Sequence, residues 1–119
     1  MGIGKIQFIV MDTQDADAIA PFWCEVLGTE EDVRVGGDQF VVLKASEDAP
    51  PLAFQKVPDG KSVKNRMHLE IGVADLEDAK AQILEFGGSI LSDTYELEGY
   101  FWINVADPEG HEFDISVGG

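Results

Sequence analysis

Three side chains in the second half of this 119-residue sequence are of types that bind metal ions or move protons. They are His68, Glu70 and Asp114. Imidazole and carboxylate groups are common ligands of divalent metal ions. A carboxylate in an apolar pocket is also suited to act as a general base, and Glu70 is our candidate for that role. Whether these groups form a site depends on the elements that carry them.

An internal repeat places two of these residues in matching elements. The segments 15–28 and 75–88 each begin with Asp after an apolar run, continue with helix-like spacing and end on Gly. Each half then closes with another apolar run, at 52–55 and 113–116. Two copies of one unit are expected to pack as a pseudo-symmetric pair.

His68 opens the second copy of this repeat and Asp114 closes it, so we expect the two to lie together. Their counterparts in the first copy are Phe8 and Gln55. The first copy therefore offers an apolar side chain and a neutral amide where the second offers an imidazole and a carboxylate.

Periodicity predicts the order β-α-β-β-β in each half. Asp15 and Asp75 are predicted helix N-caps, because each precedes a stripe of apolar residues at three- and four-residue spacing. The predicted helices span 15–27 and 75–86. The strands located by pattern span 6–11, 39–44, 52–57, 67–73, 89–91, 100–105 and 112–117.

Alternation within the strands predicts which face each side chain occupies. The apolar residues of strand 67–73 must meet the helix of their module, so His68 and Glu70 lie on the opposite, helix-free face. Strand 112–117 alternates in the same way and places Asp114 on that face too.

In the first half the matching positions on the helix-free face are apolar and include Phe8 and Val10. If that face is concave and closed by the other module, one wall of the pocket is apolar and the other is polar. Such a lining is typical of a small-molecule site. Tyr100 and Trp102 share one face of their strand; if it is this face, they can stack on a planar ligand.

The composition bounds the class of protein. The chain has 8 Lys+Arg against 23 Asp+Glu, a formal net charge of −15. This acidity argues against nucleic acid and anionic membranes as partners. The single Cys24 excludes an internal disulfide, and we read it as structural. The N-terminus lacks the pattern of a signal peptide, and no apolar run approaches the roughly 20 residues of a membrane span. We therefore expect a cytoplasmic protein with one domain over 1–119.

Three motifs in order resemble a known superfamily. They are FWCEVLG at 22–28, NRMHLEIGVAD at 65–75 and DPEGHEFD at 107–114. Together they resemble the glyoxalase/bleomycin-resistance/extradiol-dioxygenase (vicinal oxygen chelate) superfamily, in its short glyoxalase-like form. The resemblance implies an α+β fold in which two βαβββ modules form a cupped mixed sheet. The modules would span about 3–57 and 66–119, joined by a connection at 58–65.

The resemblance also implies a divalent metal ion held by side chains from the first and last strands of each module. At the matching positions this sequence has Phe8, Gln55, His68 and Asp114. Phe8 cannot bind a metal, which leaves Gln55, His68 and Asp114 as the implied ligands of Zn, Fe, Mn or Ni, or a site that binds no metal. His111 stands in the third motif where relatives commonly have Asn, and we expect it to be exposed.

Several functions remain open at this stage. The chain can be a binding protein for a small, partly apolar molecule with a degenerate metal site. Alternatively, it can be a metal-dependent lyase, isomerase or dioxygenase acting on vicinal oxygens of a small substrate. A structural dimer module without a ligand is the third possibility. The alternative for His68 itself is a partly exposed residue bonded to Glu70, Glu112 or the backbone. We also expect a homodimer, because small modules of this kind commonly cover exposed sheet edges by pairing.

Overall fold

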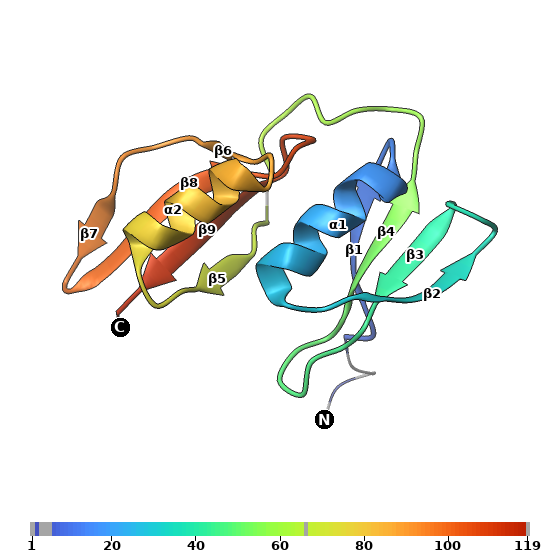
Figure 1. Cartoon of the computed structure of the whole chain (residues 1–119), viewed down its shortest axis with the longest axis horizontal. Helices are drawn as coiled ribbons and strands as arrows, with labels where there is room; N and C mark the ends of the chain where they lie inside the picture. The colour runs from blue at the N-terminus through green and yellow to red at the C-terminus, as the bar shows by residue number, and fades with distance from the viewer. Residues whose placement is uncertain (1, 3–5, 66, 119) are drawn as a thin grey trace. The chain divides into compact units, whose positions relative to one another are not determined.

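The computed structural model describes residues 2, 6–65 and 67–118. The chain divides into two units, the first ending at Gly60 and the second beginning at Lys61. Within the described residues, each unit carries one helix and one mixed sheet, which confirms the predicted α+β class (Figure 1). The predicted module starts at about 3 and 66 lie outside the described residues. The assignment of 1–119 to one domain stays a prediction.

The first unit has the predicted βαβββ order. Its elements are β1 (Ile9–Thr13), α1 (Ala16–Leu27), β2 (Glu31–Val35), β3 (Phe40–Leu43) and β4 (Leu52–Lys56). The sheet order is β1-β4-β3-β2, with β1 and β4 parallel and the other neighbours antiparallel. Helix α1 packs on β3 and β4, where Trp23, Ile19 and Phe54 are fully buried.

The second unit repeats this plan with one strand more than predicted. Its elements are β5 (Glu70–Gly72), α2 (Leu76–Glu85), β6 (Ser89–Ile90), β7 (Tyr95–Leu97), β8 (Tyr100–Ala106) and β9 (Glu112–Val117). The sheet order is β5-β9-β8-β6, with β5 and β9 parallel, and β7 pairs with β8. Helix α2 packs on β6, β8 and β9.

The strands differ from prediction mainly at their ends. β1 begins at Ile9 instead of residue 6, and β5 covers only 70–72 of the predicted 67–73. His68 therefore precedes the strand, although the Asp114 N–H still donates to the Leu69 carbonyl at 3.0 Å. The pattern failed to locate β2 and β7 because every residue in both is exposed, so neither strand shows a buried face.

Both predicted N-caps are confirmed, and both helices lie within the predicted ranges. An Asp15 side-chain oxygen accepts a hydrogen bond from the Ala18 N–H at 3.2 Å, and Asp75 accepts one from Asp78 at 2.9 Å. α1 ends at Gly28, whose φ of 63° is left-handed and favours glycine.

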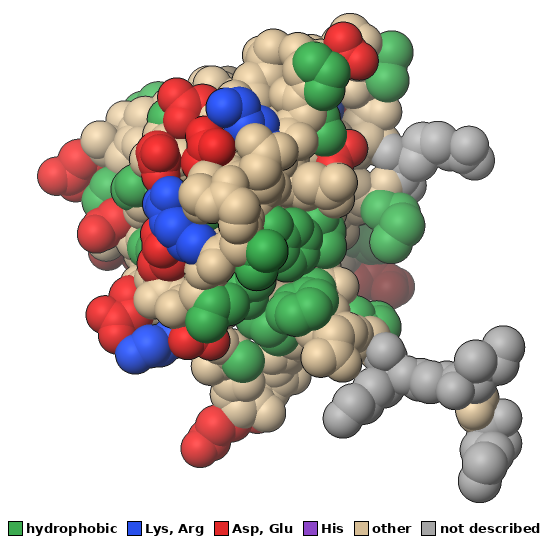
Figure 2. Space-filling view, turned by 90° about the vertical axis from the view of Figure 1, so that its right-hand side faces the viewer, with side chains coloured by type: hydrophobic (Ala, Val, Ile, Leu, Met, Phe, Trp, Pro, Cys, Tyr) green, Lys and Arg blue, Asp and Glu red, His purple; other side chains and the backbone are tan. Residues whose placement is uncertain are grey.

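Basic side chains of the first unit lie beside acidic ones. Arg34 pairs with Asp17 and Glu31, and Lys44 pairs with Glu30. Figure 2 shows one face of the molecule on which Lys and Arg side chains are interspersed with Asp and Glu side chains, next to a hydrophobic patch. Within the described residues, no helix is both long enough and apolar enough to span a bilayer.

Replacing Asp75 with Ala should lower the free energy of unfolding by about 1 kcal/mol, because the Asp78 N–H loses its acceptor at the helix start. Urea denaturation measures the change. Asp75→Asn keeps the acceptor and should lose only part of it. Asp93→Ala, in the exposed loop before β7, is the control and should shift the midpoint little. An Asp75→Ala protein as stable as the wild type would show that this cap contributes nothing.

Candidate metal centre in the second unit

The register of three strands places the candidate carboxylates on one face of the sheet. Glu70 on β5 pairs with Asp114 on β9, and Asp114 pairs with Asn104 on β8. The alternate positions, such as Ile103 and Ile115, are buried and apolar. Because α2 must cover the apolar face, the carboxylates lie on the helix-free face, as the alternation predicted.

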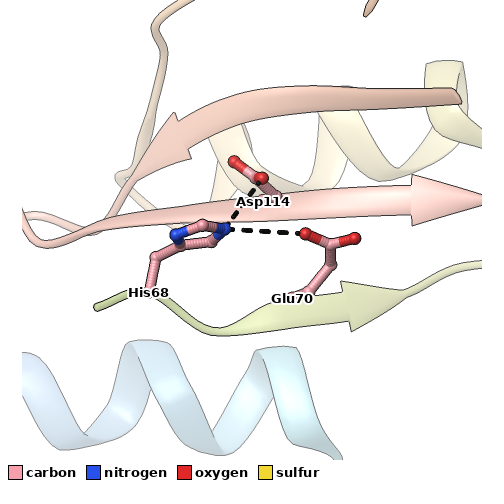
Figure 3. A group of neighbouring side chains, drawn as sticks. All are labelled: His68, Glu70 and Asp114. Atoms are coloured by element: carbon pink, nitrogen blue, oxygen red, sulfur yellow. Dashed lines mark ion pairs between the residues drawn. The ribbon is translucent and has the colours of Figure 1, made fainter. Parts of the chain in front are cut away.

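His68 completes a cluster with these two carboxylates (Figure 3). Its Nε2 lies 3.3 Å from Asp114 Oδ2 and 3.7 Å from Glu70 Oε1. One ligand atom from each residue lies within 4.8 Å of the other two. The side chains of His68, Glu70 and Asp114 are 53 %, 37 % and 10 % exposed, so the cluster is anchored at Asp114 and open at His68.

Each carboxylate has its other oxygen held by a neutral donor. Asn104 Nδ2 donates to Asp114 Oδ1 at 2.6 Å, and the Tyr100 hydroxyl donates to Glu70 Oε2. The bond to Glu70 raises the pKa of Tyr100, against an opposite effect of the Ser116 hydroxyl. The phenol is therefore protonated at neutral pH and acts as a donor. The oxygens that face His68 remain available.

The Tyr100 hydroxyl on β8 reaches Glu70 on β5, across the intervening strand β9. On this face the register aligns Trp102 with two small residues, Ser116 on β9 and Gly72 on β5. A Cβ at Gly72 would meet no heavy atom within 4 Å. Because its hydroxyl bonds to Glu70, Tyr100 occupies the polar face, which the sequence left open. Trp102 lies on the same face, 5.9 Å from the Tyr100 ring and stacked on Tyr95 at 5.5 Å.

Glu112 holds the segment before His68 in place through hydrogen bonds and ion pairs. Its Oε1 accepts the Asn65 N–H at 3.1 Å, and its main-chain carbonyl accepts the Asn65 side-chain amide at 2.7 Å. Lys61 and Lys64 also pair with its carboxylate, at 3.2 and 3.5 Å. The Asn65 N–H, and after it Lys61, lower the pKa of Glu112. Sequence reasoning missed this clamp, although Asn65 stands in the motif that contains His68.

Three first-unit residues were predicted to line the site. They lie on the sheet of the first unit or directly before its first strand. Phe8 precedes β1 and contacts Phe40 edge-on, with ring centroids 6.1 Å apart. Val10 is 44 % exposed. Gln55 is exposed on β4, paired with Asp12 and Phe40. Its role as a ligand, and the roles of Phe8 and Val10 as an apolar wall, stay predictions.

Two other residues of chemically active types are accounted for by their surroundings. Burial, and after it the nearby Glu31, raise the pKa of the Cys24 thiol beside a cavity of about 330 Å³. The thiol thus stays protonated, which suits a structural residue.

His111 was expected to be exposed, and this is wrong. Its side chain is only 15 % exposed, because its Nδ1 lies 2.7 Å from the buried Asp107 carboxylate at the start of the 107–110 turn.

The cluster is suited to a divalent ion by the chemistry of its donors. One imidazole nitrogen and two carboxylate oxygens are borderline and hard ligands, which Zn, Fe, Mn and Ni accept. Atoms that share one ion at about 2.1 Å lie roughly 3.0–3.5 Å apart. The separations of 3.3 and 3.7 Å from His68 Nε2 are close to that range. All three ligand atoms lie within 4.8 Å of one another, so a bound ion would draw them closer together.

The sequence matches the family model of the glyoxalase-like domain over residues 8–116, and the chain belongs to this family. No curated protein matches the sequence.

The chain is similar to several solved structures, including two that carry the glyoxalase/bleomycin resistance/dioxygenase name. A glyoxalase/bleomycin resistance protein/dioxygenase from Nocardioides is 15 % identical, with a TM-score of 0.76 over 100 % of this chain and 88 % of that one. A family enzyme from Burkholderia phytofirmans is 18 % identical, with a TM-score of 0.73 over 93 % and 96 %. The fosfomycin resistance protein FosX from Mesorhizobium loti is 12 % identical, with a TM-score of 0.72 over 100 % and 95 %. At these identities the likeness shows the fold alone.

Glu112→Gln should lower stability at neutral pH, because it weakens the contacts with Asn65 and both lysines. The pKa of Glu112 is lowered by folding, so its contribution is present above the ordinary value of 4.5 and is lost as pH falls through the folded value. The difference in melting temperature between wild type and variant should therefore shrink below about pH 4. Glu47→Gln, in an exposed loop, is the matched control. A difference that persists unchanged into acid would contradict this origin.

Proposed function

We propose that the second unit holds a divalent metal ion through His68, Glu70 and Asp114, and that the protein uses this centre to bind a small, partly apolar molecule. The observation that supports this most is the approach of one His68 nitrogen to an oxygen of each carboxylate, at 3.3 and 3.7 Å. Two carboxylates so close are compensated more fully by a divalent cation than by one imidazolium.

The exposure of the cluster supports a binding role. An ion held by three protein atoms from one side keeps positions open for other ligands. His68 and Glu70 are the more exposed members, so the open side of the ion is on their side. Trp102, Tyr100 and Tyr95 provide aromatic surface on the same face, and Phe8 and Val10 are the proposed apolar wall.

Metal-dependent catalysis is the second candidate, favoured by this open side. A bound ion would polarise substrate oxygens as a Lewis acid, which is the chemistry a lyase, isomerase or dioxygenase of this superfamily requires. We assign Glu70 to the metal in preference to the general-base role expected from sequence. Its carboxylate oxygen is within reach of the position that the ion would share with His68.

His68→Ala and Asp114→Asn should each weaken metal binding at least roughly 100-fold, because each removes one of three donors. Isothermal titration with Zn²⁺ and Ni²⁺ into protein stripped with chelator measures the affinity. Both variants should keep the wild-type circular dichroism spectrum, since neither side chain lies in the apolar core beneath α2. Tight binding that survives both substitutions would remove the proposal.

Glu70→Gln and Gln55→Ala test which of these two residues binds the ion together with His68 and Asp114. If Glu70 binds the ion, Glu70→Gln weakens affinity strongly; if it acts only as a base, the affinity is kept and only turnover is lost. If Gln55 is a further ligand, as the family resemblance implies, Gln55→Ala also weakens affinity. An unchanged affinity in Gln55→Ala would leave the second unit as the whole binding site.

We also propose a homodimer in the cytoplasm. The exposed edge strand β2, with Val33 and Val35 50 % and 63 % exposed, supports pairing between copies. Multi-angle light scattering at micromolar concentration should give twice the chain mass of 13.0 kDa. A monomer mass across the concentration range would contradict it.

A further inference from the structure

We infer that Asn104 and Tyr100 are positioning residues that limit Asp114 and Glu70 to one metal-binding oxygen each. This inference rests on the proposed metal site. Nothing in the sequence motifs indicates it, because the two residues lie on β8, outside the three motif segments.

The Asp114 side of the site shows the arrangement most directly. Asn104 is the cross-strand partner of Asp114, so its amide stands beside the carboxylate. Its Nδ2 donates to Oδ1 at 2.6 Å, while Oδ2 faces His68 Nε2 at 3.3 Å. Asp114 is only 7 % exposed, which leaves its carboxylate little freedom to rotate. One oxygen is thus committed to the amide and the other points to the shared position.

The Glu70 side has the same division through a different donor. The Tyr100 hydroxyl donates to Oε2, while Oε1 is the oxygen nearer His68 Nε2. Glu70 is longer and more exposed than Asp114, so without a partner its carboxylate could turn. The ring of Tyr100 is itself fixed beside Trp102, with centroids 5.9 Å apart. Tyr100 therefore supplies the orientation that the sheet alone does not give.

The consequence is a small, mixed donor set. Two carboxylates held in this way offer two oxygens to an ion, not four, beside one imidazole nitrogen. Ca²⁺ takes about six to eight oxygen ligands and often binds carboxylates through both oxygens. Zn²⁺ is satisfied by four ligands and accepts nitrogen. Asn104 and Tyr100 therefore favour Zn²⁺-like ions and disfavour Ca²⁺.

The test compares Zn²⁺ and Ca²⁺ affinities of wild type, Tyr100→Phe and Asn104→Leu by titration calorimetry of the full chain. Losing an outer hydrogen-bond partner typically costs metal affinity about 10- to 100-fold, so Zn²⁺ binding should weaken by that factor in both variants. A released carboxylate can offer both oxygens, so Ca²⁺ affinity should fall less or rise. The ratio of Zn²⁺ to Ca²⁺ affinity should thus decrease.

Tyr95→Phe is the matched control, because the Tyr95 ring also lies against Trp102 but its hydroxyl forms no hydrogen bond to a carboxylate within the described residues. It should keep the wild-type ratio. Equal weakening of both ions in Tyr100→Phe and Asn104→Leu would indicate general loosening and overturn the inference. Unchanged Zn²⁺ affinity would overturn it as well. A wild-type protein that binds neither ion would instead overturn the proposed function, and the inference with it.

Discussion

The parallel pairing of β5 with β9 is the constraint on which the candidate site depends. Its register sets Glu70 directly opposite Asp114, with strands about 4.8 Å apart. Like charges in directly opposite positions destabilise a sheet unless a cation lies between them. The Asn104 and Tyr100 donors that bond to these carboxylates are neutral, so they do not cancel the repulsion. In our proposal, a divalent metal ion bound by His68 and both carboxylates supplies the positive charge that offsets this repulsion.

Both units pack one helix on one face of a mixed sheet, but the opposite, helix-free faces differ in chemistry. In each, an Asp cap starts a helix that covers one face of a mixed sheet. The other face is then free to vary without loss of the core. In the second unit it carries the polar row Glu70, Asp114 and Asn104. The apolar core beneath α2 and the candidate site thus lie on opposite faces of the same sheet.

The sequence predicted the elements whose apolar residues recur periodically and missed the strands without such a pattern. Helix caps, the 107–110 turn and strand β9 follow from local chemistry that the pattern displays directly. β2 and β7 are exposed throughout and exist because β3 and β8 pair with them. The pairing of His111 with Asp107 depends on the path of one turn, and the Tyr100–Glu70 bond spans 30 residues. Such contacts leave no periodic signal, so only coordinates reveal them.

The length of the Asp114 side chain determines where the candidate site lies. The family resemblance implies a Glu ligand on the last strand, where this chain has Asp114. An Asp carboxylate stays close to the sheet, where the Asn104 amide reaches it at 2.6 Å and the side chain is nearly buried. A site this close to the sheet needs its other ligands to approach from the side. His68 does so from the segment before β5, and Glu70 does so with the longer arm. The proposed centre would thus lie close to β5 and draw all three of its donors from one unit.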